Sequence, residues 1–151
     1  MGNEPPGDGQ SWLLLLYTVP REPTAPRVAV WRKLKRLGAV LMQDAAWVLP
    51  ATPWTLEQFQ WLAAEIAEAD GEATVWESRL VRGQDEALTQ QFLAYVEPAY
   101  AEILTSLQAE DANLAALSRT YQEVRRRDYL QSELGKRVRD ALLAATGRRE
   151  P

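Results

Sequence analysis

The sequence predicts an α+β protein in which a four-stranded antiparallel sheet is followed by a helical C-terminal unit. Its 151 residues are enough for one hydrophobic core, and 46% apolar with 25% charged residues is typical of a globular domain. Residues 11–82 show patterns in the order strand, helix, strand, strand, helix, strand, whereas residues 83–147 show helical spacing alone. The first order is the ferredoxin-like βαββαβ arrangement, which places both helices on one face of the sheet.

An apolar run and a helical repeat predict the first strand and the first helix. Residues 12–19 form a continuous apolar run that ends at Pro20, as expected for a central strand. Thr24 is the predicted N-cap of the following helix, and Gly38 is its predicted stop. Between them, apolar residues recur at the spacing of one helical face, at Val30, Leu34 and Leu37.

A hairpin and a second helix are predicted next. The apolar stretches within residues 39–50 flank Asp44-Ala45, which is the predicted turn. Thr55 and Gln58 have the spacing of a capping box, so we expect the second helix to begin there.

The fourth strand and two more helices complete the middle of the chain. Residues 72–81 are predicted as the strand, and their imperfect alternation indicates a bulge. We expect three of its side chains to point inward, namely Val75, Trp76 and Leu80. Asp85 and Asp111 are the predicted N-caps of the next two helices.

The C-terminal region is predicted to break once more before a last helix. A break is expected within residues 128–135, with Ser132 as an acceptable N-cap, and the last helix is expected to stop at Gly147. Residues 1–10 are predicted to be a disordered arm and residues 148–151 a tail. The helical extension of 83–147 is expected to pack on 11–82 as part of one domain.

Composition excludes several kinds of chemistry. The chain has no cysteine and no histidine, so it can form no disulfide, thiolate metal site or imidazole-based catalytic triad. The remaining carboxylates show no spacing that stands out, so we expect neither an enzyme nor a cofactor or metal site. The polar start and the short first apolar run predict a cytoplasmic protein without a targeting peptide.

Charge is segregated along the chain. Residues 21–36 carry a net charge of +5, residues 37–118 a net charge of −11, and residues 119–151 a net charge of +4. A local basic field attracts a polyanion even when the whole chain is acidic. The alternative is a set of solvated helix faces.

Two basic clusters are the candidate DNA contacts. The first belongs to the predicted first helix and contains Arg27, Arg32, Lys33, Lys35 and Arg36. The second lies near the C-terminus and contains Arg125, Arg126, Arg127 and Arg137. Arginine suits phosphate and guanine edges, but cations near helix C-termini also complement the helix dipole. Arg21 and Arg27 are a weaker candidate for anion binding, because they lie near the predicted start of a helix.

The tryptophans divide into core and surface candidates. Their positions on predicted strands, or on the core side of a helix, assign four to the interior: Trp12, Trp31, Trp47 and Trp76. Trp61 falls among glutamates on the second helix, so it is expected to be exposed and available to a partner.

Several sequence stretches resemble a known family. The stretches are WLLLLYTVP at 12–20, RVAVWRKLKRLGA at 27–39, WVLP at 47–50 and GQDE at 83–86. Over about residues 11–145 the chain resembles the N-terminal domain of ChrB, a chromate-resistance regulator family. A more distant likeness is to the ferredoxin-like dimerisation domain of PaaX-type repressors.

The resemblance implies a bacterial DNA-binding regulatory domain of a chromate-responsive transcriptional regulator. Its expected partners are double-stranded promoter DNA and a second copy of the chain. A chromate-sensing domain would act in trans or belong to a longer chain. Two alternatives remain: a dimerisation module without DNA contact, and a nuclease that uses carboxylate-bound metal. The second is disfavoured because no carboxylate follows the first predicted strand.

Overall fold

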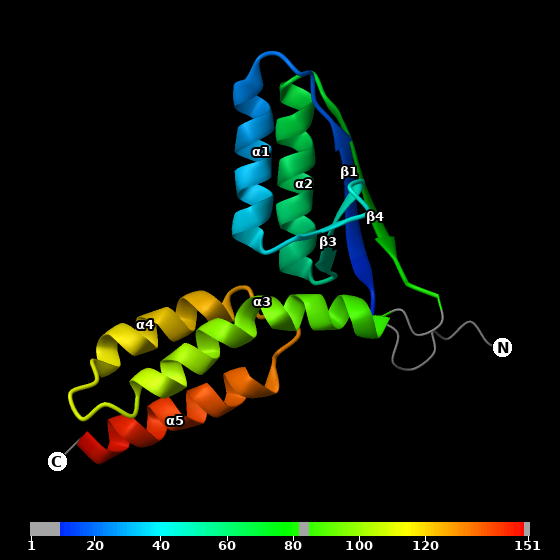
Figure 1. The fold of residues 1–151 in the computed structure, drawn as a ribbon. Coiled ribbons are helices and arrows are strands. Elements are labelled where there is room, and N and C mark those ends of the chain that lie inside the picture. Colours follow the sequence, from blue (N-terminus) through cyan, green and yellow to red (C-terminus); the bar gives the residue numbers. More distant parts are fainter. Residues whose placement is uncertain (1–9, 82–84, 150–151) are drawn as a thin grey trace. The chain divides into compact units, whose positions relative to one another are not determined.

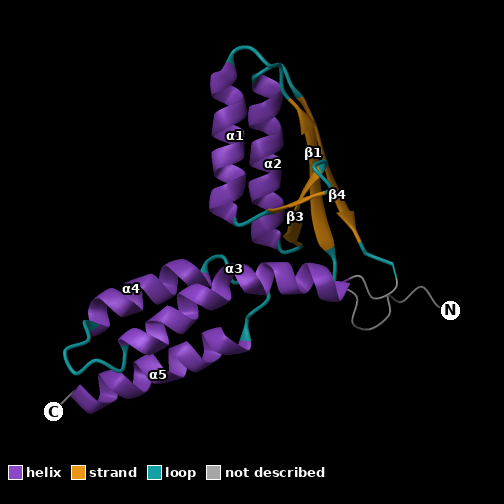
Figure 2. Cartoon of the chain, viewed as in Figure 1, coloured by secondary structure: helices purple, strands orange, loops and turns teal. Residues whose placement is uncertain are grey.

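The computed structural model describes residues 10–81 and 85–149, and it confirms the α+β class (Figures 1 and 2). Two compact units divide the chain, Met1–Glu86 and Ala87–Pro151. The expected arm at 1–10 lies outside the described residues except for Gln10, and the tail is described as far as Arg149.

A four-stranded antiparallel sheet forms the first unit. Its strands, in chain order, are β1 (Trp12–Thr18), β2 (Val40–Met42), β3 (Ala46–Pro50) and β4 (Glu72–Ser78). They are arranged β2-β3-β1-β4, so β1 is central, as its apolar run predicts. Leu15 pairs with Trp47 on β3 and with Val75 on β4.

The prediction of a bulge in the fourth strand is wrong. β4 pairs with β1 without interruption from Trp12–Ser78 to Thr18–Glu72, and it ends at Ser78. Trp76 pairs with Leu14 and therefore points to the other face from Val75. Trp76 is 56% exposed, which corrects its assignment to the core.

Two helices cover one face of the sheet (Figure 2), and both begin earlier than expected. Helix α1 (Thr24–Leu37) has Pro23 as its N-cap, because Thr24 is already helical. Helix α2 (Pro53–Glu68) is capped by Thr52, whose hydroxyl accepts from the Thr55 N–H at 3.0 Å. The capping box is therefore Thr52–Thr55, and Pro53 fits the first helical position because its φ is fixed.

Residues with a left-handed backbone end α1 and form the turn of the hairpin. Gly38 adopts a left-handed φ of 79° and ends α1, as predicted. The hairpin turn uses Gln43 and Asp44, which have φ values of 53° and 56°. The turn is thus one residue earlier than the predicted Asp44-Ala45, and two left-handed residues suit the twist of a hairpin.

The core of the first unit combines sheet and helix side chains. Residues that are at most 4% exposed come from β1, β3, α1 and α2: Leu13, Leu15, Val48, Leu49, Val30, Leu34, Phe59, Leu62 and Ile66. Trp12 is also buried, and its indole N–H donates to Asp85 at 2.8 Å. The buried Val30 and Leu34 pack α1 against the rest of this core and leave the other side of the helix exposed.

Three helices form the rest of the described chain: α3 (Asp85–Ser106), α4 (Leu114–Arg125) and α5 (Glu133–Arg149). Asn113 caps α4 in place of the predicted Asp111, because its side chain accepts from the Ala116 N–H. Ser132 caps α5 as predicted and follows the expected break. Helix α5 continues past Gly147, which corrects the predicted stop.

Buried side chains from all three helices make the core of the second unit. They are Val96, Tyr100, Ile103, Tyr121, Val124, Val138 and Leu142. Within the described ranges, no helix is long and apolar enough to span a membrane.

Candidate nucleic-acid interface

Helix α1 divides its basic residues between two flanks. All five are exposed. Arg27 and Arg32 line a pocket beside the hairpin, whereas Lys33 and Arg36 line a smaller pocket toward α2. Arg32 and Arg36 are one helical turn apart on α1 and line different pockets.

The pocket beside the hairpin, here called the α1 pocket, has a volume of about 790 Å³. Its walls come from the end of β1, the following link, α1 and the β2–β3 hairpin. It is lined by Tyr17, Thr18, Val19, Arg21, Thr24, Arg27, Val28, Trp31, Arg32, Leu41, Asp44, Ala45 and Trp47. A cavity of this size accommodates a small organic ligand.

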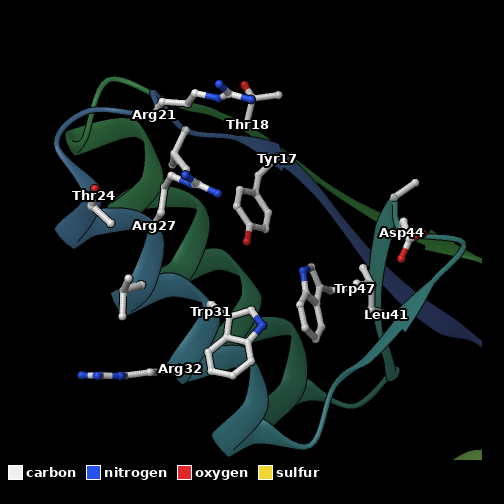
Figure 3. Close-up of a pocket in the computed structure, with 13 residues that line it drawn as sticks. Tyr17, Thr18, Arg21, Thr24, Arg27, Trp31, Arg32, Leu41, Asp44 and Trp47 are labelled. Atoms are coloured by element: carbon white, nitrogen blue, oxygen red, sulfur yellow. The ribbon is translucent and has the colours of Figure 1, made fainter.

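Three arginines give the α1 pocket its charge. Figure 3 shows Arg27 reaching toward Tyr17, Arg21 lying beside Thr18, and Arg32 pointing away from the labelled aromatic side chains. None of the three arginines forms an ion pair with another residue of the described ranges. Asp44 is the single carboxylate among the described residues that line the pocket. The pocket therefore favours an anion.

Aromatic side chains form the apolar part of the α1 pocket lining. Trp47 is 7% exposed, and its side chain is hydrogen bonded to Tyr17. Burial raises the pKa of the Tyr17 phenol, while the Trp47 hydrogen bond and the charge of Arg27 lower it in part. The phenol is thus protonated at neutral pH. Trp31 is 52% exposed, which corrects its assignment to the core.

The α2 side of α1 is already occupied by an internal ion pair. Lys33 forms an exposed salt bridge with Glu65 on α2, so its charge is partly compensated. Trp61 lines the same side and is 71% exposed, as predicted. The Lys35 ammonium lies 5.9 Å from the centroid of the Trp31 ring, a cation–π distance.

The second basic cluster belongs to the helical unit and is not uniform. Arg125 ends α4 and Arg126 is its C-cap, positions where a cation complements the helix dipole. The Arg127 guanidinium lies 5.4 Å from the Tyr95 ring and donates to its hydroxyl at 3.4 Å. Arg137 is exposed on α5. The cluster thus combines exposed charge with structural contacts.

A polar network lies at the start of α5. The Tyr100 hydroxyl donates to Asp128 at 2.8 Å, and the Ser132 N–H donates to the same carboxylate at 3.0 Å. The pKa of Tyr100 is raised by burial and then by Asp128. In the described part of the chain, no group of three or more acidic side chains has a geometry that could hold a metal ion.

Sequence reasoning found Arg21, Arg27 and Arg32 but missed the aromatic part of the pocket. The same periodicity that buries Val30 and Leu34 could have identified Trp31. One residue along a helix is a rotation of about 100°, so Trp31 lies at the edge of the apolar stripe rather than within it. Tyr17 gave no comparable signal, because its place depends on how the hairpin and α1 meet the end of β1.

The fold and the site define a two-unit α+β chain with an arginine-rich and aromatic pocket beside its first helix. Residues 27–109 match the family described as "Protein ChrB, N-terminal". The chain belongs to this family. The match begins at α1 and includes the hairpin, α2, β4 and α3.

A curated relative agrees with this assignment. The chain is 31% identical over 107 residues to Protein ChrB of Cupriavidus metallidurans, an alignment that covers 70% of this chain. It covers 32% of that relative, so the chain spans about a third of the length of the protein it matches. No solved structure matches the chain.

Proposed function

We propose that this chain is the DNA-binding regulatory domain of a cytoplasmic, chromate-responsive transcriptional regulator. Membership of the ChrB family supports the chromate-resistance context. The observation that carries DNA contact is the set of three arginines at the α1 pocket, namely Arg21, Arg27 and Arg32, which form no ion pair within the described ranges.

The cost of breaking an ion pair favours these three arginines over Lys33 on the neighbouring flank. An arginine that forms no ion pair can neutralise a phosphate and release a counterion without first breaking an internal pair. Lys33 would have to give up Glu65 to do the same. The second basic cluster contributes further phosphate contacts in this proposal, chiefly through Arg126 and Arg137.

We also assign the first unit to the ferredoxin-like class. The element order βαββαβ and the strand arrangement β2-β3-β1-β4 support this assignment. In this proposal, the chromate-responsive part acts in trans or on a longer chain, and the domain itself is a binding domain rather than an enzyme.

A titration of fluorescent duplex DNA from upstream of the operon that encodes this chain tests the proposal. Anisotropy is measured at several salt concentrations, with an unrelated duplex of equal length as the reference. If each of the three arginines neutralises one phosphate, log affinity falls against log salt with a slope of about −2.7 or steeper. Absence of binding at about 50 mM salt, or binding that does not depend on salt, contradicts the proposal.

A homodimer is a second proposal, which rests on the sheet. Strand β4 lies at an edge of the sheet, and an open edge can pair with another chain. Leu16 and Trp76 are 38% and 56% exposed on neighbouring strands, so they add apolar surface near that edge. Sedimentation at high micromolar concentration tests it, and a monomer mass contradicts it.

A further inference from the structure

We propose that the α1 pocket binds one nucleotide, with the phosphate held by Arg21 and Arg27 and the base stacked on Trp31. This inference rests on the proposed nucleic-acid function of α1 but goes beyond it. Contacts with duplex phosphates need an exposed basic face and no cavity. The structure has both a basic face and a cavity.

The volume and the lining chemistry of the pocket select the ligand class. The pocket is an open depression of about 790 Å³, which is much larger than a bare oxyanion requires and within the usual range for small-molecule sites. Its lining combines cationic and aromatic groups, whereas a site for an inorganic anion needs only the cationic ones. A ligand that satisfies both is a planar ring that carries a phosphate.

The phosphate end of the site is defined by two arginines. Arg27 is directed toward Tyr17, and Arg21 lies by Thr18 at the end of β1 (Figure 3). Both line the pocket and neither has an ionic partner in the described part of the chain. Planar guanidinium groups bind phosphate oxygens in a bidentate way. The protonated Tyr17 phenol lies close to Arg27 and can donate to the same anion.

The aromatic end of the site is Trp31. Trp31 is 52% exposed although it lines a pocket, so part of its ring is open to a ligand, and the Lys35 ammonium lies 5.9 Å from the ring centroid. Bases stack on aromatic side chains with little dependence on sequence, because every base has a π face. Trp47 and Leu41 line the hairpin side of the same pocket and add apolar surface.

The nucleotide has two sources, a free mononucleotide or an unpaired nucleotide of a DNA strand. Calorimetric titrations of the full chain with dTMP, with deoxyribose 5-phosphate and with the oligomer dT8 separate them. We expect dTMP to bind at least about fivefold more tightly than deoxyribose 5-phosphate, because only dTMP carries a base that can stack. Because dT8 offers eight nucleotides, dT8 binding tighter than dTMP binding by clearly more than about eightfold indicates the strand as the source, and a smaller difference indicates the free nucleotide.

Two variants locate the site. Trp31→Leu should weaken dTMP binding by about fivefold to 150-fold, the range measured for loss of one stacking partner. The matched control is Trp61→Leu, which removes an exposed tryptophan outside the pocket and should leave binding unchanged. Arg27→Gln should weaken dTMP and deoxyribose 5-phosphate alike, and a thermal melt confirms that each variant is folded.

Defined outcomes overturn the inference. Equal affinity for dTMP and deoxyribose 5-phosphate shows a phosphate site without a base site. An unchanged dTMP affinity in folded Trp31→Leu places the nucleotide elsewhere. Duplex titrations on the same samples keep the two proposals apart. Intact duplex binding without dTMP binding contradicts only this inference, whereas dTMP binding without duplex binding contradicts only the proposed function.

Discussion

Replacing Gly135 and Gly147 by alanine should change stability in opposite directions, although both lie in α5. Gly147 has nothing within 4 Å of the position where a Cβ would stand. Its replacement therefore brings only the helix propensity of alanine, which stabilises by about 0.5–1 kcal/mol. At Gly135 the same methyl group would lie 2.9 Å from Asp128 Oδ2 and 2.9 Å from two ring atoms of Tyr100.

The environment of Gly135 cannot relax easily. Tyr100 is 1% exposed, and its hydrogen bond to Asp128 fixes both groups. Overpacking of this kind costs about 1–3 kcal/mol, and the upper part of that range applies because three atoms are approached at once. After subtraction of the propensity gain, Gly135→Ala should destabilise the chain by about 2 kcal/mol.

Urea unfolding followed by far-ultraviolet circular dichroism measures both variants. We expect the midpoint to fall for Gly135→Ala and to rise slightly for Gly147→Ala, with unchanged slopes. If both substitutions stabilise the chain equally, the close packing of Gly135 against Tyr100 and Asp128 is refuted.

Three further predictions concern the helix cap, the buried tyrosines and the α2 side of α1. Thr52→Ala should destabilise by about 1 kcal/mol in urea unfolding, since it removes the capping box of α2; an unchanged midpoint would contradict this. The pKa values of Tyr100 and Tyr129 are raised, mainly by burial, so above pH ~10 the unfolded chain loses phenol protons that the folded chain keeps, and stability should fall. Urea midpoints at pH 9 and 11 measure this, and Tyr100→Phe should show a smaller decline than the wild type. Lys33→Gln should leave the salt dependence of DNA binding unchanged, because Glu65 already compensates Lys33; a flatter slope would be the contrary result.

Local sequence signals predict the presence of helices and strands better than the residues at which they begin and end. The apolar run of β1 and the repeat of Val30 and Leu34 depend on neighbouring residues, so the central strand and α1 were recognised. The spacing of Thr55 and Gln58 predicts that α2 starts at Thr55, but the structure uses Thr52 as the cap with Pro53 at the first helical position. Two competing N-caps differ in free energy by less than the helix gains from tertiary packing. Packing of the helix therefore determines which cap is used.

The sequence predicts the arginines of the candidate site but not the pocket that they line. Arginine is recognisable from composition, and the segregation of charge along the chain predicts the basic first helix. The pocket depends on contacts between β1, α1 and the hairpin, which are distant in sequence. Large apolar residues are usually buried, so the sequence predicts core positions for Trp31 and Trp76. Register and helix rotation determine their exposure instead.

The most direct test of the central claim compares the salt dependence of duplex DNA binding between the wild type and the triple variant Arg21→Gln, Arg27→Gln, Arg32→Gln. The account predicts that the variant stays folded, since exposed charges contribute little to stability, and that its log–log slope is flatter by about 2.7. A folded variant that keeps the wild-type slope and affinity would contradict the assignment of DNA contact to the α1 pocket.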